Sequence, residues 1–331
     1  MTHPIDLDRR TFIAGGIALA SQAVSAQGAT PAALPRIRHI RAGELEVAYF
    51  ESGPRDGVPV LLLHGFPYDF HSYVEVADLL ARRGCRVVVP QLRGHGSTRF
   101  LEPSAFRNAQ QSAVALDQLA LMDALGIRRA VVAGYDWGAR TACVLAALWP
   151  ERCVGMVSAG GYIVTSRAAQ KAPAPPRVEH AWWYQFYFAT DRGRAGLVAH
   201  RRELSRILWK ENSPQWAFDD ATFERSAAAF DNPDWVDIVV HNYRWRLGLA
   251  DGAPQLEDLE QRLAAQPPVP VPAITLDGDT NGISPAGDGK AQAARFTGPR
   301  THRVVHAGHN IPQEAPQAFA DAVWALASVR P

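Results

Sequence analysis

The stretch Gly134-Tyr135-Asp136-Trp137-Gly138 decides how the rest of this sequence is interpreted. It follows an apolar run, residues 130–133, and precedes a stretch of helical composition, residues 139–148. A strand, a sharp turn and a helix in this order place the central residue of the turn at the tip of a sheet. The flanking glycines leave room where any Cβ would crowd the turn. The pentapeptide therefore predicts a strained Asp136 between a strand and a helix.

Asp136 occupies the position that a nucleophile takes in such a turn. A carboxylate nucleophile forms an alkyl ester with a saturated carbon that carries a leaving group. The same residue could instead cap the N-terminus of the following helix, because aspartate is common at that position. The remainder of the chain has to discriminate between these two interpretations.

The composition is that of an ordinary globular protein, with 331 residues of which 47% are hydrophobic and 20% are charged. The formal net charge of +1 gives no indication of a nucleic-acid partner or of an anionic membrane surface. The sequence contains no recognisable metal-ligand cluster and no phosphate-binding glycine loop, so we expect neither a metal nor a cofactor. Cys85, Cys143 and Cys153 form an odd and sparse set, which predicts buried free thiols.

The first 26 residues have the features of an export signal. Asp8-Arg9-Arg10-Thr11-Phe12-Ile13 resembles a twin-arginine motif, and a mildly apolar stretch follows it. Val24-Ser25-Ala26 then provides small residues at a cleavage position. The apolar stretch is too short to span a membrane, so it predicts no anchor. We expect a bacterial protein that is periplasmic or secreted.

Strand and helix patterns alternate over residues 36–161 and resume over residues 267–331. Runs such as 59–63 and 85–89 are continuously apolar, which is typical of strands buried on both faces. The alternation predicts an α/β protein with a mostly parallel central sheet and helices on both faces. Residues 162–266 are rich in aromatic residues and arginine, and we interpret them as a helical cap inserted into this core domain.

Five short motifs follow one another along the chain: His64-Gly65-Phe66-Pro67, Asp136-Trp137, Tyr184-Gln185, Tyr243-Arg244 and Gly308-His309-Asn310. In this order they resemble the α/β-hydrolase fold and, within it, the epoxide hydrolases. The motifs are similar to the loop after the third strand, the nucleophile, the two cap tyrosines and the catalytic histidine loop. The resemblance extends from about residue 36 to the C-terminus.

The resemblance implies a catalytic role for each motif. Asp136 would be the nucleophile, and His309 would activate the water that cleaves the ester. The backbone N–H groups of Phe66 and Trp137 flank the turn and would stabilise the oxyanion. His64, Arg93 and His95 are expected to brace loops rather than to react.

Tyr184 and Tyr243 are the residues that the resemblance assigns to the epoxide oxygen. Opening an epoxide leaves an alkoxide, which is a poor leaving group at neutral pH, so a proton donor lowers the barrier. Two phenols from the cap could supply that donor. The alternative is that both side chains only pack within an aromatic cap.

The residue that orients His309 departs from the family pattern. The family pattern there is Gly-x-x-Asp-x-x-x-Pro, in which the aspartate is the orienting acid. The corresponding stretch of this chain is Gly278-Asp279-Thr280-Asn281-Gly282-Ile283-Ser284-Pro285, so Asn281 stands at the position of the acid. Asp279 lies two residues earlier, and we expect it to supply the charge. The alternative is that Asn281 orients His309 without charge. In a serine-protease triad, an aspartate-to-asparagine change costs about 10⁴-fold in rate.

The leading prediction is an enzyme that converts a small apolar epoxide and water into a vicinal diol. The first alternative is a haloalkane dehalogenase, in which Asp136 attacks and the Trp137 indole holds the halide. Phe66 is evidence against a dehalogenase, because haloalkane dehalogenases commonly have asparagine at this position. Haloacid-type relatives carry arginine directly after the nucleophile, where this chain has Trp137. A non-catalytic binding protein with an aromatic ligand cage is the third interpretation, and Asn281 is its only support.

Overall fold

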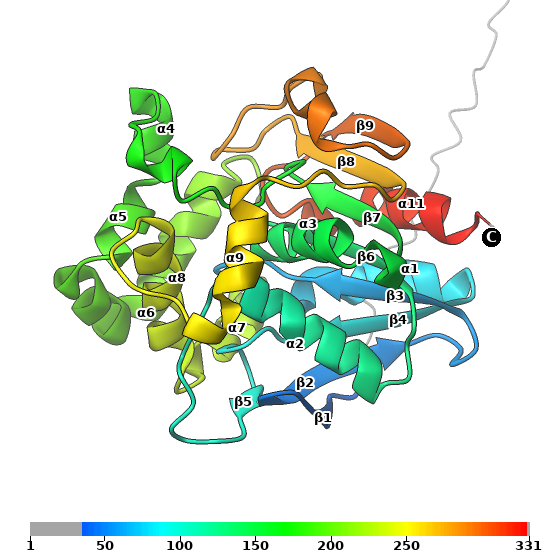
Figure 1. Ribbon diagram of the computed structural model, residues 1–331, viewed down its shortest axis with the longest axis horizontal. Helices are drawn as coiled ribbons and strands as arrows, with labels where there is room; N and C mark the ends of the chain where they lie inside the picture. Colours follow the sequence, from blue (N-terminus) through cyan, green and yellow to red (C-terminus); the bar gives the residue numbers. More distant parts are fainter. Residues whose placement is uncertain (1–34, 330–331) are drawn as a thin grey trace, which may run out of the picture. The chain divides into compact units, whose positions relative to one another are not determined.

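The core of the protein is one β-sheet (Figure 1). The computed structural model describes residues 35–329. Across these residues nine strands follow the order β1-β2-β4-β3-β6-β7-β8-β9, with β5 paired to β2. The strands are β1 (Arg38–Ala42), β2 (Leu45–Ser52), β3 (Val58–Leu63), β4 (Cys85–Pro90), β5 (Arg99–Phe100), β6 (Ala130–Tyr135), β7 (Cys153–Ala159), β8 (Ala273–Gly278) and β9 (Arg300–Val305).

The sheet is mostly parallel, as predicted. All neighbours from β4 to β9 run parallel, whereas β2 pairs antiparallel with β1, β4 and β5. Gly134 at the end of β6 lies opposite Leu63 of β3 and Ser158 of β7. The carboxyl ends of these strands therefore meet at one edge, which brings the loops after β3 and β6 together.

Helices cover both faces of the sheet (Figure 1). α1 (Val74–Arg82) and α11 (Pro316–Ala327) pack together on one face, and α2 (Gln111–Ala124) and α3 (Trp137–Leu148) pack together on the other. Every residue of β6 is buried between these layers. Burial on both faces explains why the strands are continuously apolar rather than alternating.

Six helices separate β7 from β8, within the range predicted for the cap. They are α4 (Pro176–Ala181), α5 (Trp183–Phe188), α6 (Asp191–Asn212), α7 (Asp220–Ala227), α8 (Trp235–Arg246) and α9 (Glu257–Ala264). The indole N–H of Trp209 in α6 donates to the carbonyl of Pro67 at 2.6 Å. The Asn232 amide, between α7 and α8, donates to the carbonyl of Thr98 at 2.7 Å. The segment is thus fastened to the loops that follow β3 and β4.

Several expectations concern features outside the sheet. The predicted export signal, residues 1–26, lies outside the described residues. Between residues 35 and 329, no helix has the length and apolar character needed to cross a bilayer. Cys85, Cys143 and Cys153 are buried free thiols, which confirms the prediction for them.

Candidate active site

Asp136 lies in the strained turn that the sequence predicts. Its backbone has φ 51° and ψ −120°, between the last residue of β6 and the first of α3. A Cβ on Gly138 would lie 1.9 Å from the carbonyl oxygen of Leu63, and one on Gly134 would lie 2.3 Å from the carbonyl carbon of Gly138. Only glycine fits at these two positions, because Gly138 is pressed against the end of β3 and Gly134 against the backbone of the turn itself.

The carboxylate of Asp136 is held by the loop after β3. The backbone N–H of Phe66 donates to its Oδ1 at 2.7 Å. Within the described residues the side chain makes no hydrogen bond that would cap α3, so the helix-cap interpretation does not describe it. The second predicted donor, the N–H of Trp137, begins α3 directly after the turn. The turn and the loop together form the environment expected of an oxyanion site.

His309 faces the other oxygen of the same carboxylate. Its Nε2 lies 3.5 Å from Oδ2 of Asp136. Burial alone would raise the pKa of Asp136, but the adjacent His309, the charge of Arg140 and the Phe66 N–H together lower it. Asp136 is therefore an anion at neutral pH, which is the reactive form of a carboxylate nucleophile.

An aromatic roof covers the nucleophile. The ring of Phe66 stacks on Trp137 at 5.2 Å between centroids and also contacts Tyr184 of α5 and Tyr243 of α8. The rings of Tyr184 and Tyr243 lie 5.7 Å apart, and both side chains are buried. Burial and the negative charge of Asp136 raise the pKa of Tyr184 to about 12. For Tyr243, burial, Tyr184 and then Asp136 raise the pKa well above its usual value. Both phenols thus keep their protons at neutral pH.

The loop that carries His309 is fixed by two residues that the sequence analysis missed. Ser213, just after α6, accepts the N–H of His309 at 2.8 Å and donates to Glu314 at 2.6 Å. Glu314 ends α10 (Ile311–Glu314) and accepts the N–H groups of Gly308 and Asn310 at 2.7 and 3.0 Å. An acid five residues after a loop histidine was the available signal for Glu314. The sequence contains no signal for Ser213, because this residue reaches the His309 loop only when the helical segment between β7 and β8 folds over it.

Asp279 does not reach His309, so the structure corrects the prediction that it supplies the orienting charge. Its carboxylate oxygens lie 3.0 and 3.1 Å from Nδ1 of His306 on an exposed part of the surface. The N–H of Asp279 donates to the carbonyl of Val305, which fixes its backbone beside β9 and turns its side chain away from the site. The residue next to His309 is Asn281, whose Nδ2 lies 3.4 Å from Nδ1.

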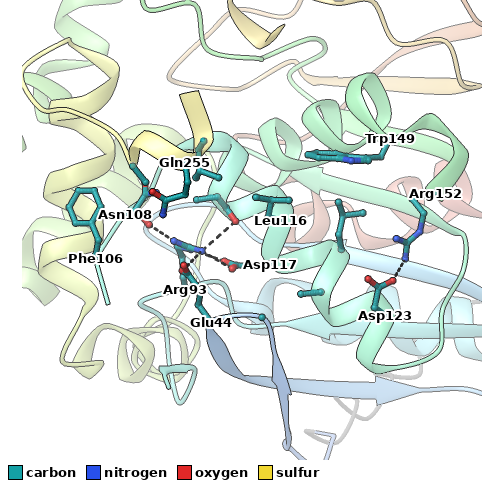
Figure 2. A pocket seen from close by; sticks show the side chains of 16 residues that line it. Glu44, Arg93, Phe106, Asn108, Leu116, Asp117, Asp123, Trp149, Arg152 and Gln255 are labelled. Atoms are coloured by element: carbon teal, nitrogen blue, oxygen red, sulfur yellow. Dashed lines mark hydrogen bonds and ion pairs between the residues drawn. The ribbon is translucent and has the colours of Figure 1, made fainter. Parts of the chain in front are cut away.

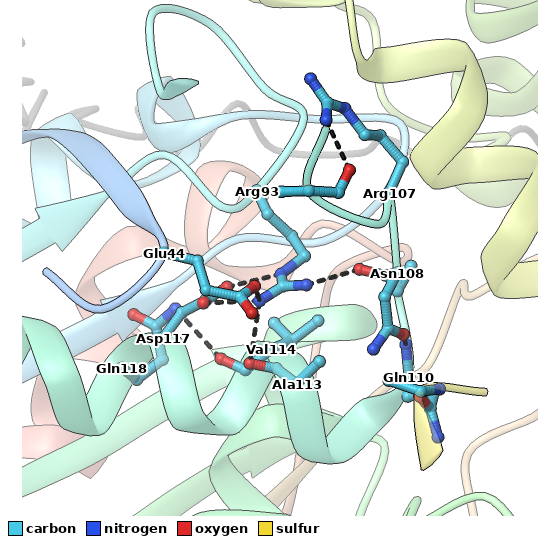
Figure 3. Close-up of polar contacts among 12 residues, drawn as sticks. Glu44, Arg93, Arg107, Asn108, Gln110, Ala113, Val114, Asp117 and Gln118 are labelled. Carbon is cyan, nitrogen blue, oxygen red and sulfur yellow. Dashed lines mark hydrogen bonds and ion pairs between the residues drawn. The ribbon is translucent and has the colours of Figure 1, made fainter. Parts of the chain in front are cut away.

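The other polar residues near the sheet edge have the bracing roles expected of them. His64 Nδ1 donates to the carbonyl of Gly65 at 2.9 Å, and its Nε2 accepts the N–H of Leu92 at 3.0 Å. Arg93 makes two short bonds to Asp117 of α2, at 2.6 and 2.7 Å, and one to the carbonyl of Asn108 (Figure 3). Both ring nitrogens of His64 are used, which leaves it no lone pair or proton for catalysis.

A surface pocket of about 550 Å³ lies beside this arginine and not at Asp136 (Figure 2). Its walls include Arg93, Asp117, Trp149 and Arg152, and no predicted catalytic residue lines it. Among residues 35–329, no group of three or more His, Cys, Asp or Glu side chains is arranged to hold a metal ion.

Comparison with known proteins places the chain in a family. A model described as the alpha/beta hydrolase fold matches residues 58–316, a range that includes the turn at Asp136 and the His309 loop. The chain belongs to the α/β-hydrolase family. Membership, together with the relatives below, identifies the protein as a hydrolase.

The resemblance to epoxide hydrolases is confirmed by several of these relatives. A crystal structure of a "putative epoxide hydrolase" from Klebsiella pneumoniae has a TM-score of 0.87 and 52% identity, covering 89% of this chain and 98% of that one. Epoxide hydrolase B of Mycobacterium tuberculosis is 32% identical over 171 residues, which are 48% of this chain and 47% of the relative. A haloalkane dehalogenase of Mycobacterium marinum is 29% identical over 215 residues, which are 61% of this chain and 67% of the relative. The match to epoxide hydrolase B spans about half the length of that relative.

Proposed function

We propose that this α/β-hydrolase opens a small apolar epoxide to a vicinal diol through a covalent ester on Asp136. The proposal rests on the groups that surround this carboxylate. Phe66 N–H binds one oxygen, His309 Nε2 lies 3.5 Å from the other, and two buried phenols lie in the roof above. The Klebsiella and Mycobacterium tuberculosis relatives support the same assignment.

In the first step, Oδ2 of Asp136 attacks an epoxide carbon, and the bond from that carbon to the epoxide oxygen breaks. The oxygen takes a proton from Tyr184 or Tyr243, both of which stay protonated at neutral pH. The product of this step is a hydroxyalkyl ester of Asp136. The apolar roof of Phe66 and Trp137 favours a substrate without charge near the reacting carbon.

In the second step, water attacks the carbonyl carbon of the Asp136 ester while His309, in the tautomer that has its lone pair on Nε2, takes the proton of the water. The N–H groups of Phe66 and Trp137 would hold the resulting oxyanion, because they already flank this carboxyl group. Collapse of the tetrahedral intermediate breaks the bond between the carboxyl carbon and the alkyl oxygen. The departing alkoxide takes the proton from the His309 imidazolium and leaves as the diol. The proton of the newly formed Asp136 carboxylic acid passes to the tyrosinate, which regenerates the carboxylate and the neutral phenol.

A single turnover in ¹⁸O-water tests this route, with styrene oxide and a short aliphatic epoxide as substrates. Ester hydrolysis places the label in Asp136, so the first diol released contains ¹⁶O from the enzyme. Direct attack of water on the epoxide would place ¹⁸O in the first diol and would refute the covalent step. Mass spectrometry of the diol and of the peptide that contains Asp136 measures both.

One observation favours a dehalogenase as the second candidate. The indole Nε1 of Trp137 is buried and has no hydrogen-bond partner in the described part of the chain, so it could donate to a departing halide. Haloalkane dehalogenases are among the relatives. Chloride or bromide release from a panel of haloalkanes, assayed beside epoxide turnover, decides between the two activities.

A further inference from the structure

The C-terminal end of α6 lies between the two loops that carry Asn281 and His309. The carbonyl of Asn212, the last residue of α6, accepts the N–H of Gly282 at 2.9 Å, directly after Asn281. Ser213 follows Asn212 and accepts the N–H of His309 at 2.8 Å. Two consecutive residues of the segment between β7 and β8 therefore bond to both loops that bring the amide and the imidazole together.

Glycine permits this close approach in both loops. A Cβ on Gly282 would lie 1.8 Å from the carbonyl oxygen of Glu211, and one on Gly308 would lie 2.5 Å from Oγ and 2.7 Å from Cα of Ser213. These separations are below van der Waals contact, so an alanine at either position would force α6 and the loop apart. The end of α6 is thus packed against the backbone of the two loops and not only against adaptable side chains.

The Ser213 hydroxyl has a defined orientation, because it donates to Oε1 of Glu314 at 2.6 Å and so presents a lone pair to the N–H of His309. The same carboxylate accepts the N–H groups of Gly308 and Asn310, on either side of the histidine. Ser213 is 1% exposed, so bulk water does not compete for these bonds. One hydroxyl therefore joins the inserted helices to the backbone of the catalytic loop.

The imidazole ring itself is weakly held. Its Nδ1 lies 3.4 Å from the Asn281 amide nitrogen, which is long for a hydrogen bond, and its Nε2 lies 3.5 Å from Asp136. Among residues 35–329, neither ring nitrogen makes a shorter polar contact. The position of the ring is therefore set through the backbone of His309, which Ser213 binds. A displacement of about 1 Å at a reacting group can cost about 10²-fold in rate, so this bond bears directly on catalysis.

We propose that Ser213 is a positioning residue for hydrolysis of the ester. By holding the backbone of His309, it keeps Nε2 in line with the water that attacks the Asp136 ester, and it does so from the inserted helices and not from the core domain. The inference rests on the proposed covalent mechanism. Formation of the ester requires the carboxylate and a phenol but no proton transfer to His309, so Ser213 should not affect that earlier step.

Single-turnover kinetics with styrene oxide separate the two steps, because quenched-flow mass spectrometry measures both the formation and the decay of the Asp136 adduct. Ser213→Ala should slow decay by about 10–10²-fold and leave the rate of formation within about twofold. Ser226→Ala is the matched control and should change neither rate, because it removes a buried hydroxyl of α7 that has no hydrogen-bond partner in the described part of the chain. A role in stability alone would slow both steps alike or neither.

The outcomes separate this inference from the mechanism on which it rests. No adduct in the wild-type protein and no ¹⁸O in Asp136 would refute the covalent mechanism, and the inference with it. An adduct that decays equally fast in the wild-type protein and in Ser213→Ala would overturn the inference alone, as would an equal slowing of formation and decay.

A second pair of variants keeps the test decisive if Ser213→Ala fails to fold. Gly282→Ala moves the Asn281 loop away from the end of α6 and should also slow only the decay of the adduct. Gly287→Ala is its control in the same loop, because the nearest atom outside its chain neighbours would lie 3.8 Å from an added Cβ. If the adduct decays as fast in Gly282→Ala as in Gly287→Ala, the end of α6 does not position the water-activating pair and the proposal is wrong.

Discussion

The side-chain amide of Asn281 presents its N–H₂ group to Nδ1 of His309, at 3.4 Å. The amide cannot turn round, because its oxygen accepts the backbone N–H groups of Ile283 and Ser284 at 2.9 and 3.4 Å. A donor at Nδ1 requires a lone pair there, so the neutral imidazole carries its proton on Nε2. Nε2 is the atom that faces Asp136 and would have to accept a proton from water. The native contact therefore selects the tautomer that is unsuited to a general base.

Asn281→Asp should accelerate ester hydrolysis by about 10²–10⁴-fold, because a carboxylate would accept Nδ1–H, free Nε2 and stabilise the imidazolium. Asp279→Asn is the matched control and should change little, since Asp279 contacts His306. Single-turnover rates of adduct decay measure both. If another group activates the water, Asn281→Asp should hydrolyse the ester no faster than the wild-type protein.

In the native protein, slow deacylation should let the ester accumulate. With excess epoxide, mass spectrometry should find Asp136 heavier by the mass of one substrate, at steady state and without any trapping variant. Asp136→Asn should show neither adduct nor diol, a loss of about 10⁶-fold, with an unchanged Tm. Diol formation by a folded Asp136→Asn protein would remove Asp136 from the mechanism.

The sequence was sufficient to predict the sheet, because buried parallel strands leave continuous apolar runs such as Leu61 to Leu63. It was also sufficient for the strained turn at Asp136, since only glycine fits at Gly134 and Gly138. It failed for Asp279, because two residues along a strand-end loop can point in opposite directions. The role of Ser213 could not be predicted, because about a hundred residues of sequence separate it from the His309 loop that it contacts.

Removing the phenol groups should slow formation of the ester and not its hydrolysis. Tyr184→Phe and Tyr243→Phe should each reduce the single-turnover alkylation rate, and the double variant should lose about 10²–10⁴-fold. Asn281→Asp serves as the contrast, because it should affect only the later step. An unchanged alkylation rate in the double variant would leave both tyrosines as packing residues.

The raised pKa of the tyrosines gives alkylation a characteristic pH dependence. An ordinary phenol loses its proton near pH 10, whereas burial and Asp136 raise the pKa of Tyr184 to about 12. The raised pKa means that the donor form persists to higher pH. Alkylation in stopped-flow experiments should therefore stay level from pH 7 to about pH 10. A fall centred near pH 10 would mean that the donor titrates as an exposed phenol.

We propose that residues 1–26 direct export through the twin-arginine route. Changing Arg9 and Arg10 together to lysine should leave the precursor in the cytoplasm, because the motif depends on the arginine pair. Cell fractionation and the N-terminal sequence of the mature protein measure the result. Export of the doubly substituted protein at the normal level would reject this signal.

The buried ion pair of Arg93 and Asp117 gives a stability prediction that is separate from catalysis. The side chains are 3% and 5% exposed and are joined by two bonds of 2.6 and 2.7 Å. Asp117→Asn leaves the buried guanidinium with only the exposed Glu44 carboxylate, 3.7 Å away, as a counter-charge, which should lower the free energy of unfolding by about 3–5 kcal/mol. Replacing both residues, as Arg93→Met with Asp117→Leu, removes the poorly compensated charge and should restore most of that loss. Urea unfolding of the three proteins measures the effect. If the double variant is no more stable than Asp117→Asn, the loss comes from the bonds that Arg93 makes to Asn108 and Ala113 and not from its charge.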